Sequence, residues 1–261
     1  MNIKNVKTIV ISLTAIILCC SCKVNVKDPV HVDEYYQATE IPIIVRDFIG
    51  YDRDVDPSLT AYKHPDFDHN ACGTGILQGL LEETLDKDKK PVFNDNINPR
   101  KLWIESKETF AQWFRTIEGV NKEVRKTITF KSINNSSDYE FYLDDYFFPI
   151  DGEGFGDSLG SGNTHNYNFT VEATFYLLCK ENTPIIFTCG SDDDLWLFVN
   201  NKLVVNLGGL HMIESVTETI NPEDFNAKPG DYMEIKVFKA ERCPTGSVMN
   251  IKVSQELYLK K

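Results

Sequence analysis

The sequence Thr188-Cys-Gly-Ser-Asp-Asp-Asp-Leu-Trp-Leu-Phe-Val-Asn-Asn-Lys-Leu-Val-Val-Asn-Leu-Gly-Gly-Leu-His211 joins three consecutive carboxylates to two apolar runs. The runs 195–199 and 202–207 are separated by Asn200 and Asn201, and asparagine tolerates the positive φ of a tight hairpin turn. We therefore predict a β-hairpin here, ended by a Gly-Gly pair, with the three aspartates at its entrance.

Asp192, Asp193 and Asp194 are adjacent anions at the mouth of this hairpin, so their repulsion is costly unless a cation offsets it. Carboxylate oxygens are the ligands that Ca²⁺ prefers in proteins. The alternative is a solvated acidic turn that needs no metal. The position before a strand, not on an exposed helix face, favours a calcium site.

The composition restricts the class of partner. The chain has 261 residues, enough for one large β domain, and carries 27 basic against 39 acidic side chains, a net charge of −12. This balance argues against binding nucleic acid or anionic lipid through bulk charge, and it suits a cation site.

Further blocks accompany the hairpin over roughly residues 40–257. In chain order they are Ile41-Pro-Ile-Ile-Val-Arg-Asp-Phe48, His64-Pro-Asp-Phe67, Lys90-Pro-Val-Phe93, Phe110-Ala-Gln-Trp-Phe-Arg115, Phe147-Phe-Pro-Ile-Asp-Gly152, His165-Asn-Tyr-Asn-Phe-Thr170, Lys239-Ala-Glu-Arg242 and Thr245-Gly-Ser247. This ordered set resembles the bacterial fibro-slime domain, which is similar to the protective-antigen-type β-sandwich of toxins, glycosidases and fungal flocculin adhesins. Asn201 stands where the family usually has Gly, and Asn206 where it often has Asp.

The resemblance implies a chemistry for the hairpin. In such adhesins two adjacent aspartates joined by a cis peptide hold Ca²⁺, and sugar hydroxyls bind the ion directly; the matching pair here is Asp192 and Asp193. Asp194 falls where relatives often have Gly, and Asp151 is a further candidate ligand. The expected metal ligands are Asp192, Asp193, Asp194 and Asn206, and the expected ligand-binding residues are Trp196 and His211.

The N-terminus resembles that of a bacterial lipoprotein. A basic start, residues 1–7, precedes an apolar run, residues 8–18, that suits a secretory signal but is short for a membrane span. Cys22 after Ser21 is the expected lipidation site, with Cys20 as the alternative. We expect a signal peptide over 1–21, a flexible tether over 22–39, and an exported protein anchored by lipid at the outer membrane or cell surface.

Four cysteines follow the N-terminal group: Cys72, Cys179, Cys189 and Cys243. An even number in an exported chain predicts two disulfides, with three possible pairings. Zinc is disfavoured because no Cys-x-x-Cys spacing occurs.

The remaining segments predict an all-β, antiparallel β-sandwich over 40–257, protective-antigen-like, with one short amphipathic helix and long loops. The helix is expected over 106–117, where Ser106 can cap it and Phe110, Trp113, Phe114 and Ile117 form one apolar stripe. Short alternating runs separated by turn residues predict the strands.

The segment Gly156-Asp-Ser-Leu-Gly160 matches the Gly-x-Ser-x-Gly pattern of serine hydrolases. A hydrolase elbow needs a strand before the serine and a helix after it, whereas glycines surround Ser158 and no helical period follows. We therefore expect no enzyme. The sequence favours a surface-anchored lipoprotein whose domain binds carbohydrate through Ca²⁺. The alternative is a non-catalytic structural or protein-interaction module of the cell envelope with a purely structural Ca²⁺ site.

Overall fold

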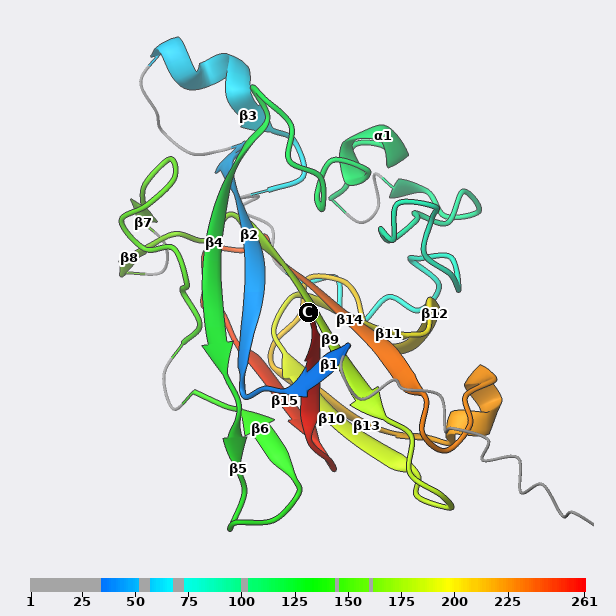
Figure 1. The fold of residues 1–261 in the computed structure, drawn as a ribbon. Coiled ribbons are helices and arrows are strands. Elements are labelled where there is room, and N and C mark those ends of the chain that lie inside the picture. Colours follow the sequence, from blue (N-terminus) through cyan, green and yellow to red (C-terminus); the bar gives the residue numbers. More distant parts are fainter. Residues whose placement is uncertain (1–33, 52–56, 68–72, 100–102, 144–145, 160–161) are drawn as a thin grey trace, which may run out of the picture. The chain divides into compact units, whose positions relative to one another are not determined.

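The computed structural model describes residues 34–51, 57–67, 73–99, 103–143, 146–159 and 162–261. The chain divides into residues 1–33 and 34–261. The expected signal peptide, Cys22 and most of the expected tether thus lie outside the described residues. With 43% strand and 7% helical residues the protein is all-β, as predicted (Figure 1). None of the described helices is long and apolar enough to cross a membrane.

The larger sheet has nine strands in the described part of the chain and runs in the order β1-β16-β9-β14-β11-β12. β2 joins it through β9 and carries β4, its antiparallel neighbour, and the short parallel strand β3. The strands are β1 (Tyr35–Gln37), β2 (Glu40–Gly50), β3 (Lys63–His64), β4 (Asn121–Thr129), β9 (Phe169–Leu178), β11 (Asp194–Val199), β12 (Lys202–Leu207), β14 (Tyr232–Glu241) and β16 (Leu257–Lys260).

The smaller sheet has five described strands in the order β13-β10-β15-β6-β5. They are β5 (Lys131–Ser132), β6 (Tyr139–Phe141), β10 (Ile185–Ser191), β13 (Glu214–Ile220) and β15 (Met249–Val253). A separate hairpin pairs β7 (Ser158–Leu159) with β8 (Thr164–His165). Described 3-10 turns span η1 (Pro57–Tyr62) and η3 (Pro222–Phe225).

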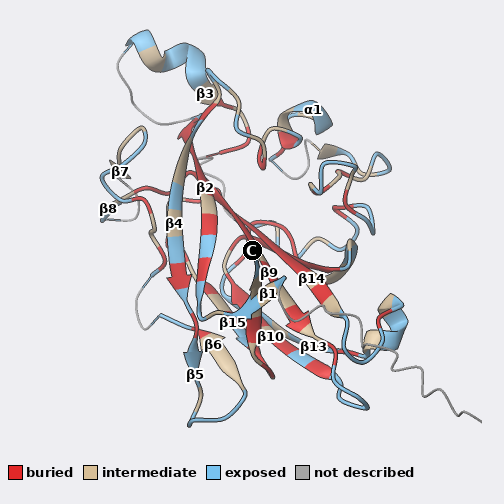
Figure 2. Cartoon of the chain, in the orientation of Figure 1, coloured by how far each residue is buried: buried red, intermediate tan, exposed pale blue. Residues whose placement is uncertain are grey.

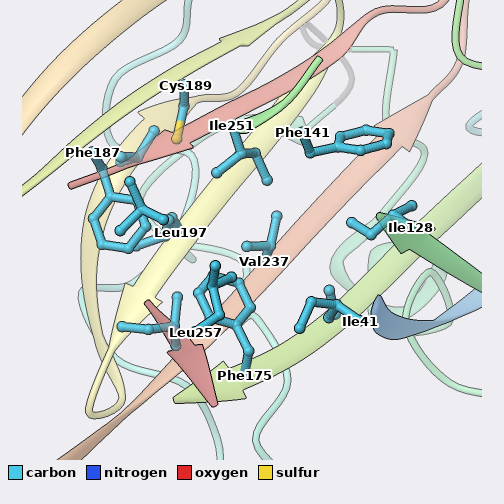
Figure 3. Packing of buried hydrophobic residues seen from close by; sticks show 14 of the residues in the cluster. Ile41, Ile128, Phe141, Phe175, Phe187, Cys189, Leu197, Val237, Ile251 and Leu257 are labelled. Carbon is cyan, nitrogen blue, oxygen red and sulfur yellow. The ribbon is translucent and has the colours of Figure 1, made fainter. Parts of the chain in front are cut away.

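The main core lies between the two sheets. Phe175, Leu197 and Val237 of the larger sheet pack in one cluster with Phe187 and Ile251 of the smaller sheet (Figure 3). Each fully buried side chain of this size contributes roughly 1.5–3 kcal/mol. The two layers and their antiparallel pairing confirm the predicted sandwich.

A second core covers the other face of the larger sheet. Residues 73–120, which we call the cover segment, contribute Phe110, Trp113 and Phe114, and these pack against Trp196 and Phe238 of the sheet. β11 is consequently buried at every residue, and β14 along almost its whole length (Figure 2). This explains why residues 195–199 are continuously apolar: alternate side chains enter different cores.

The predicted helix over 106–117 is much shorter than expected. α1 spans only Lys107–Phe110, begun by a capping box in which Ser106 accepts from the Thr109 amide. Beyond it, Trp113 N donates to Phe110 O, a tighter three-residue bond. The indole of Trp113 donates to Asp66 over 2.9 Å. Burial of that indole against Asp66 fixes the chain in turns where periodicity predicts a helix.

The domain begins earlier than the sequence suggests. β1 lies inside the expected tether and pairs with β16, with Tyr35 opposite Lys260. Tyr35 also stacks on Tyr232 at a centroid distance of 4.1 Å. The boundary expected at residue 40 therefore moves to about residue 34, because short polar strands lack a strong alternation signal.

The expectation of two disulfides among the four cysteines after the N-terminal group is wrong, because two of the four are unpaired. Cys179 and Cys189 are free and buried, and burial raises the pKa of the Cys179 thiol to about 11 and that of Cys189 to about 12. Both act as small apolar core residues. Cys243 is disulfide-bonded, and Cys72 lies outside the described residues.

Candidate functional site

The three aspartates lie where β10 leaves the smaller sheet and β11 enters the larger one. Asp194 begins β11 and pairs with Ala240 of β14. The alternation of β14 then places Lys239 and Glu241 on one face beside them, and Arg242 follows. We call Asp192, Asp193, Asp194, Lys239, Glu241 and Arg242 the acidic cluster.

The turn into β11 is made by Asp193. Its φ is 48°, and its amide donates to His211 O over 3.3 Å. Aspartate is one of the few residues that adopts this left-handed region readily. All described peptide bonds are trans. The cis bond implied for Asp192 and Asp193 is therefore wrong, and the positive φ at Asp193 makes the turn instead.

The Asp194 carboxylate is fully occupied by donors from the protein. Its Oδ2 accepts from Arg242 Nε over 2.7 Å and its Oδ1 from Gly209 N over 2.6 Å, and the residue is fully buried. The Arg242 guanidinium lies over the Trp113 ring at 4.7 Å. Asp194 thus joins the hairpin to the cover segment through Arg242, and each of its oxygens already accepts a hydrogen bond from the protein.

Asp192 and Asp193 each keep one oxygen that accepts no hydrogen bond from the described residues. Asp192 Oδ1 accepts from Val248 N over 2.6 Å, and Asp193 Oδ2 accepts from Arg242 N over 3.0 Å. The Asp192 side chain retains 14% exposure, so it faces the opening of the cluster.

Lys239 is a fully buried cation inside the cluster. Its Nζ lies 3.0 Å from the Asp192 carbonyl oxygen, 3.3 Å from Asp192 Oδ1 and 3.2 Å from Glu241 Oε2. Burial raises the pKa of Glu241, and Ser247 acts in the opposite direction. Even so, Glu241 Oε1 and Ser247 Oγ are buried and have no described partner with hydrogen-bond geometry. One carboxylate oxygen of the cluster is therefore unsatisfied.

Negative charge exceeds positive charge in this buried place, since four carboxylates face only two cations. Burial raises the pKa of Asp193 to about 6, although Lys239 and Arg242 oppose the shift. Burial likewise raises the pKa of Glu241 well above its usual range. Burial disfavours the charged form of Lys239, but Glu241 and Asp192 outweigh it and raise its pKa. The cluster needs either protons or an added cation.

The donor set fits a hard cation in part. No three His, Cys, Asp or Glu side chains among the described residues converge to hold a metal ion by themselves. The excess charge, the unsatisfied Glu241 oxygen and the open oxygens of Asp192 and Asp193 nevertheless match oxygen-ligand chemistry. A cation at this place would need further ligands from backbone, water or a bound molecule.

Asn206 and Trp196 face each other across the two strands of the hairpin, next to the pair Leu195 and Leu207. Asn206 Oδ1 accepts from Trp196 Nε1 and from Gly208 N, each over 3.1 Å. Trp196 has no exposed surface. The side-chain oxygen of Asn206, an expected metal ligand, thus accepts hydrogen bonds from the protein. The expected ligand-binding Trp196 is a core residue, because the cover segment buries its face.

His211 is held by backbone carbonyls. Its Nδ1 lies 2.8 Å from Met212 O and its Nε2 3.0 Å from Leu207 O, and it is 9% exposed. Both ring nitrogens are engaged, so His211 shapes the loop that bonds to Asp193.

The charged residues at the end of β14 were not predicted as part of the site from the sequence. In the structure Glu241 contacts Lys239 and Arg242 contacts Asp194. Charged residues in an otherwise apolar strand were the available signal, because such residues are buried only when paired.

An exposed aromatic residue flanks the cluster. Tyr146 is 56% exposed. A Cβ placed on Gly246 would lie 3.2 Å from Tyr146 Cε1 and 3.5 Å from Asp192 Oδ2. Gly246 therefore keeps a gap open between the tyrosine ring and the free carboxylate oxygen.

Among the described residues Ser158 has no hydrogen bond to a base. β7 and β8 place Ser158 opposite His165, whose Nδ1 lies 2.6 Å from Asp151 Oδ2. However, Ser158 Oγ is buried and has no described hydrogen-bond partner, and the His165 ring stacks on Phe148 at 3.9 Å. Asp151 is engaged here and does not join the acidic cluster.

Comparison with known proteins gives a family match and curated relatives. The model of the PA14 domain matches residues 122–260. Proteins psiR and psiQ of Dictyostelium discoideum are 32% and 33% identical to the chain over 206 and 208 residues, covering 75% and 76% of it. The chain spans 20% of the length of each of these relatives.

Solved structures show weaker likeness. A PA14 sugar-binding domain from an RTX adhesin is 16% identical, with a TM-score of 0.28, over 49% of this chain and 77% of that one. A β-glucosidase from Kluyveromyces marxianus in complex with glucose is 15% identical, with a TM-score of 0.31, over 74% of this chain and 18% of that one.

Proposed function

The chain belongs to the PA14 domain family, and from that premise we propose that it is an exported, surface-anchored carbohydrate-binding module whose acidic cluster binds sugar with Ca²⁺. The observation that carries this proposal is the excess of buried carboxylates over cations at the mouth of the hairpin. A divalent cation neutralises that excess. Ca²⁺ and sugar binding are also what the resemblance to protective-antigen-type domains implies for these aspartates.

The roles of the residues follow from their contacts. Asp192 and Asp193 would hold the ion through their free oxygens, while Asp194 and Lys239 fix the backbone and carboxylates around them. A bound calcium ion supplies a centre of positive charge that takes vicinal sugar hydroxyls as ligands. Tyr146 offers an aromatic face beside it, suited to the apolar face of a sugar ring.

The second candidate is a structural or protein-interaction module in which Ca²⁺ only stiffens the loops. Its supporting observation is burial: Asp193 is 3% exposed and Asp194 is fully buried. In this case calcium raises the melting temperature and no sugar binds.

A glycan array with and without EDTA tests the first candidate. We expect calcium-dependent binding by the wild type, loss in Asp192→Asn, and loss in Gly246→Val, whose side chain fills the gap beside Tyr146. Asp224→Asn, an exposed aspartate on η3, is the matched control and should bind as the wild type. Calcium-dependent melting without any sugar signal would instead select the structural candidate.

The anchor rests on the sequence alone, because Cys22 lies outside the described residues. Metabolic labelling with palmitate should mark the wild type and not Cys22→Ser. Labelling that is lost in Cys20→Ser and kept in Cys22→Ser moves the acceptor to Cys20, and an unlabelled wild type contradicts the lipid anchor.

A further inference from the structure

A groove of about 460 Å³ lies between β4 and residues 141–143 and 146–149. One wall carries Tyr142, Leu143 and Tyr146, and the other carries Thr127 and Thr129. This size falls in the range of roughly 300–1,000 Å³ typical of small-ligand sites. The groove combines aromatic faces with hydroxyl groups, which is the mixture that a sugar ring requires.

The apolar wall is unusually exposed. Tyr142 is 54% exposed, Leu143 40% and Tyr146 56%. Three large apolar side chains gathered in one exposed place are characteristic of a binding surface. Lys131, which also lines the groove, adds a donor for hydroxyl groups, whereas Lys126 pairs with Glu153.

Tyr146 connects this groove to the acidic cluster. Its ring lines the groove, and the same ring lies against Gly246 next to Asp192 Oδ2. A molecule that binds at Asp192 and extends along Tyr146 therefore reaches a residue that lines the groove. Continuity of this kind favours one extended ligand over two unrelated ones.

We propose that the groove is a second subsite, which takes further sugar rings of the glycan held at the acidic cluster. The inference rests on the proposed function and adds that the ligand is an oligosaccharide rather than a single terminal sugar. Tyr142 and Leu143 cover the apolar faces of those rings, and Thr127, Thr129 and Lys131 bond to their hydroxyl groups.

Binding should consequently grow with the length of the sugar. The test uses immobilised mono-, tri- and hexasaccharides of mannose, galactose and glucose, with calcium present. For the sugar that binds, the wild type should prefer the longer forms by about tenfold, the effect of one good aromatic contact. Tyr142→Ala should lose this preference and keep the monosaccharide affinity, whereas Tyr142→Phe should retain both.

Tyr36→Ala is the matched control, because Tyr36 is 47% exposed on β1, on another part of the domain. A wild type that binds all lengths equally, or a preference that survives Tyr142→Ala, overturns the second subsite while leaving the acidic cluster as a sugar site. A wild type that binds no sugar of any length overturns the proposed function itself, and with it this inference.

Discussion

Two buried charge clusters lie on the larger sheet and differ in sign. On β9, Glu172 meets three cations: Arg46 Nη1 at 3.2 Å, Lys90 Nζ at 2.5 Å and Lys236 Nζ at 3.3 Å. At the hairpin mouth four carboxylates meet only Lys239 and Arg242. Buried carboxylates on the same sheet therefore lie in surroundings of opposite net charge.

The difference appears in the carboxyl groups. Burial disfavours the charged form of Glu172, yet Lys90 and the other cations outweigh it and lower its pKa. For Asp193 burial prevails and raises the pKa to about 6. The Glu172 cluster is complete within the protein and, through Lys90, ties the cover segment to the sheet. The acidic cluster is incomplete, which is what a site for an external cation requires.

The largest expected effect comes from removing one cation from each cluster. Lys239→Met should lower the unfolding free energy by roughly 3–5 kcal/mol, because buried carboxylates lose their partner. Lys236→Met should cost about 1 kcal/mol or less, since Arg46 and Lys90 still surround Glu172. Urea unfolding in EDTA measures both, and equal losses would remove the contrast between the clusters.

The next prediction distinguishes Asp194, the counter-ion of Arg242, from Asp192, a proposed calcium ligand. Asp194→Asn should cost about 3 kcal/mol, because Arg242 is left buried without its counter-ion. This loss should be the same in calcium and in EDTA. Asp192→Asn should cost less and should abolish stabilisation by calcium. If calcium still stabilises Asp192→Asn, the assignment of Asp192 as a ligand is wrong.

The metal-free domain should lose stability as pH rises from about 4 to 6. The unfolded carboxyl of Asp193 releases its proton near pH 3.8, whereas the folded carboxyl holds it to about 6. The folded state therefore binds more protons in this window, a contribution of up to about 3 kcal/mol that higher pH removes.

Unfolding curves in EDTA across this window check the sign, with Asp193→Asn as the variant that should flatten the slope. Glu172 has a lowered pKa and acts in the opposite direction at lower pH. A metal-free domain that gains stability between pH 4 and 6 contradicts the burial of uncompensated charge.

The smallest expected effect concerns the unsatisfied oxygen. Glu241→Gln keeps an acceptor for Lys239 but removes a charge that burial disfavours, so unfolding in EDTA should shift by no more than about 1 kcal/mol. Stabilisation by calcium should weaken. A large loss of stability in EDTA would show that Glu241 is needed as a counter-ion.

Local sequence signals predicted the hairpin well. Asn200 and Asn201 both have positive φ, 45° and 76°, as a tight turn between two apolar runs requires. The sandwich and most strand positions were likewise predictable from alternation. The family assignment holds at the level of the PA14 domain, and the narrower fibro-slime assignment stays a prediction.

Other features of the fold and the site depend on tertiary packing and could not be predicted from local sequence patterns. Alternation could not show that the cover segment buries Trp196, because a strand buried on both faces is apolar throughout. Lys239 on β14 and Asp192, which follows β10, are 47 residues apart in the sequence, so no local pattern pairs them. The early end of α1 depends on the bond from Trp113 to Asp66, another distant contact.

Thermal unfolding of the wild type and Asp193→Asn, in EDTA and then with increasing Ca²⁺, tests the central claim most directly. A cation that binds only the folded domain adds about 2.7 kcal/mol at a hundred times its dissociation constant. We predict a melting temperature that rises with calcium in the wild type and stays constant in Asp193→Asn. A wild-type melting temperature that is the same in EDTA and in calcium would contradict the account.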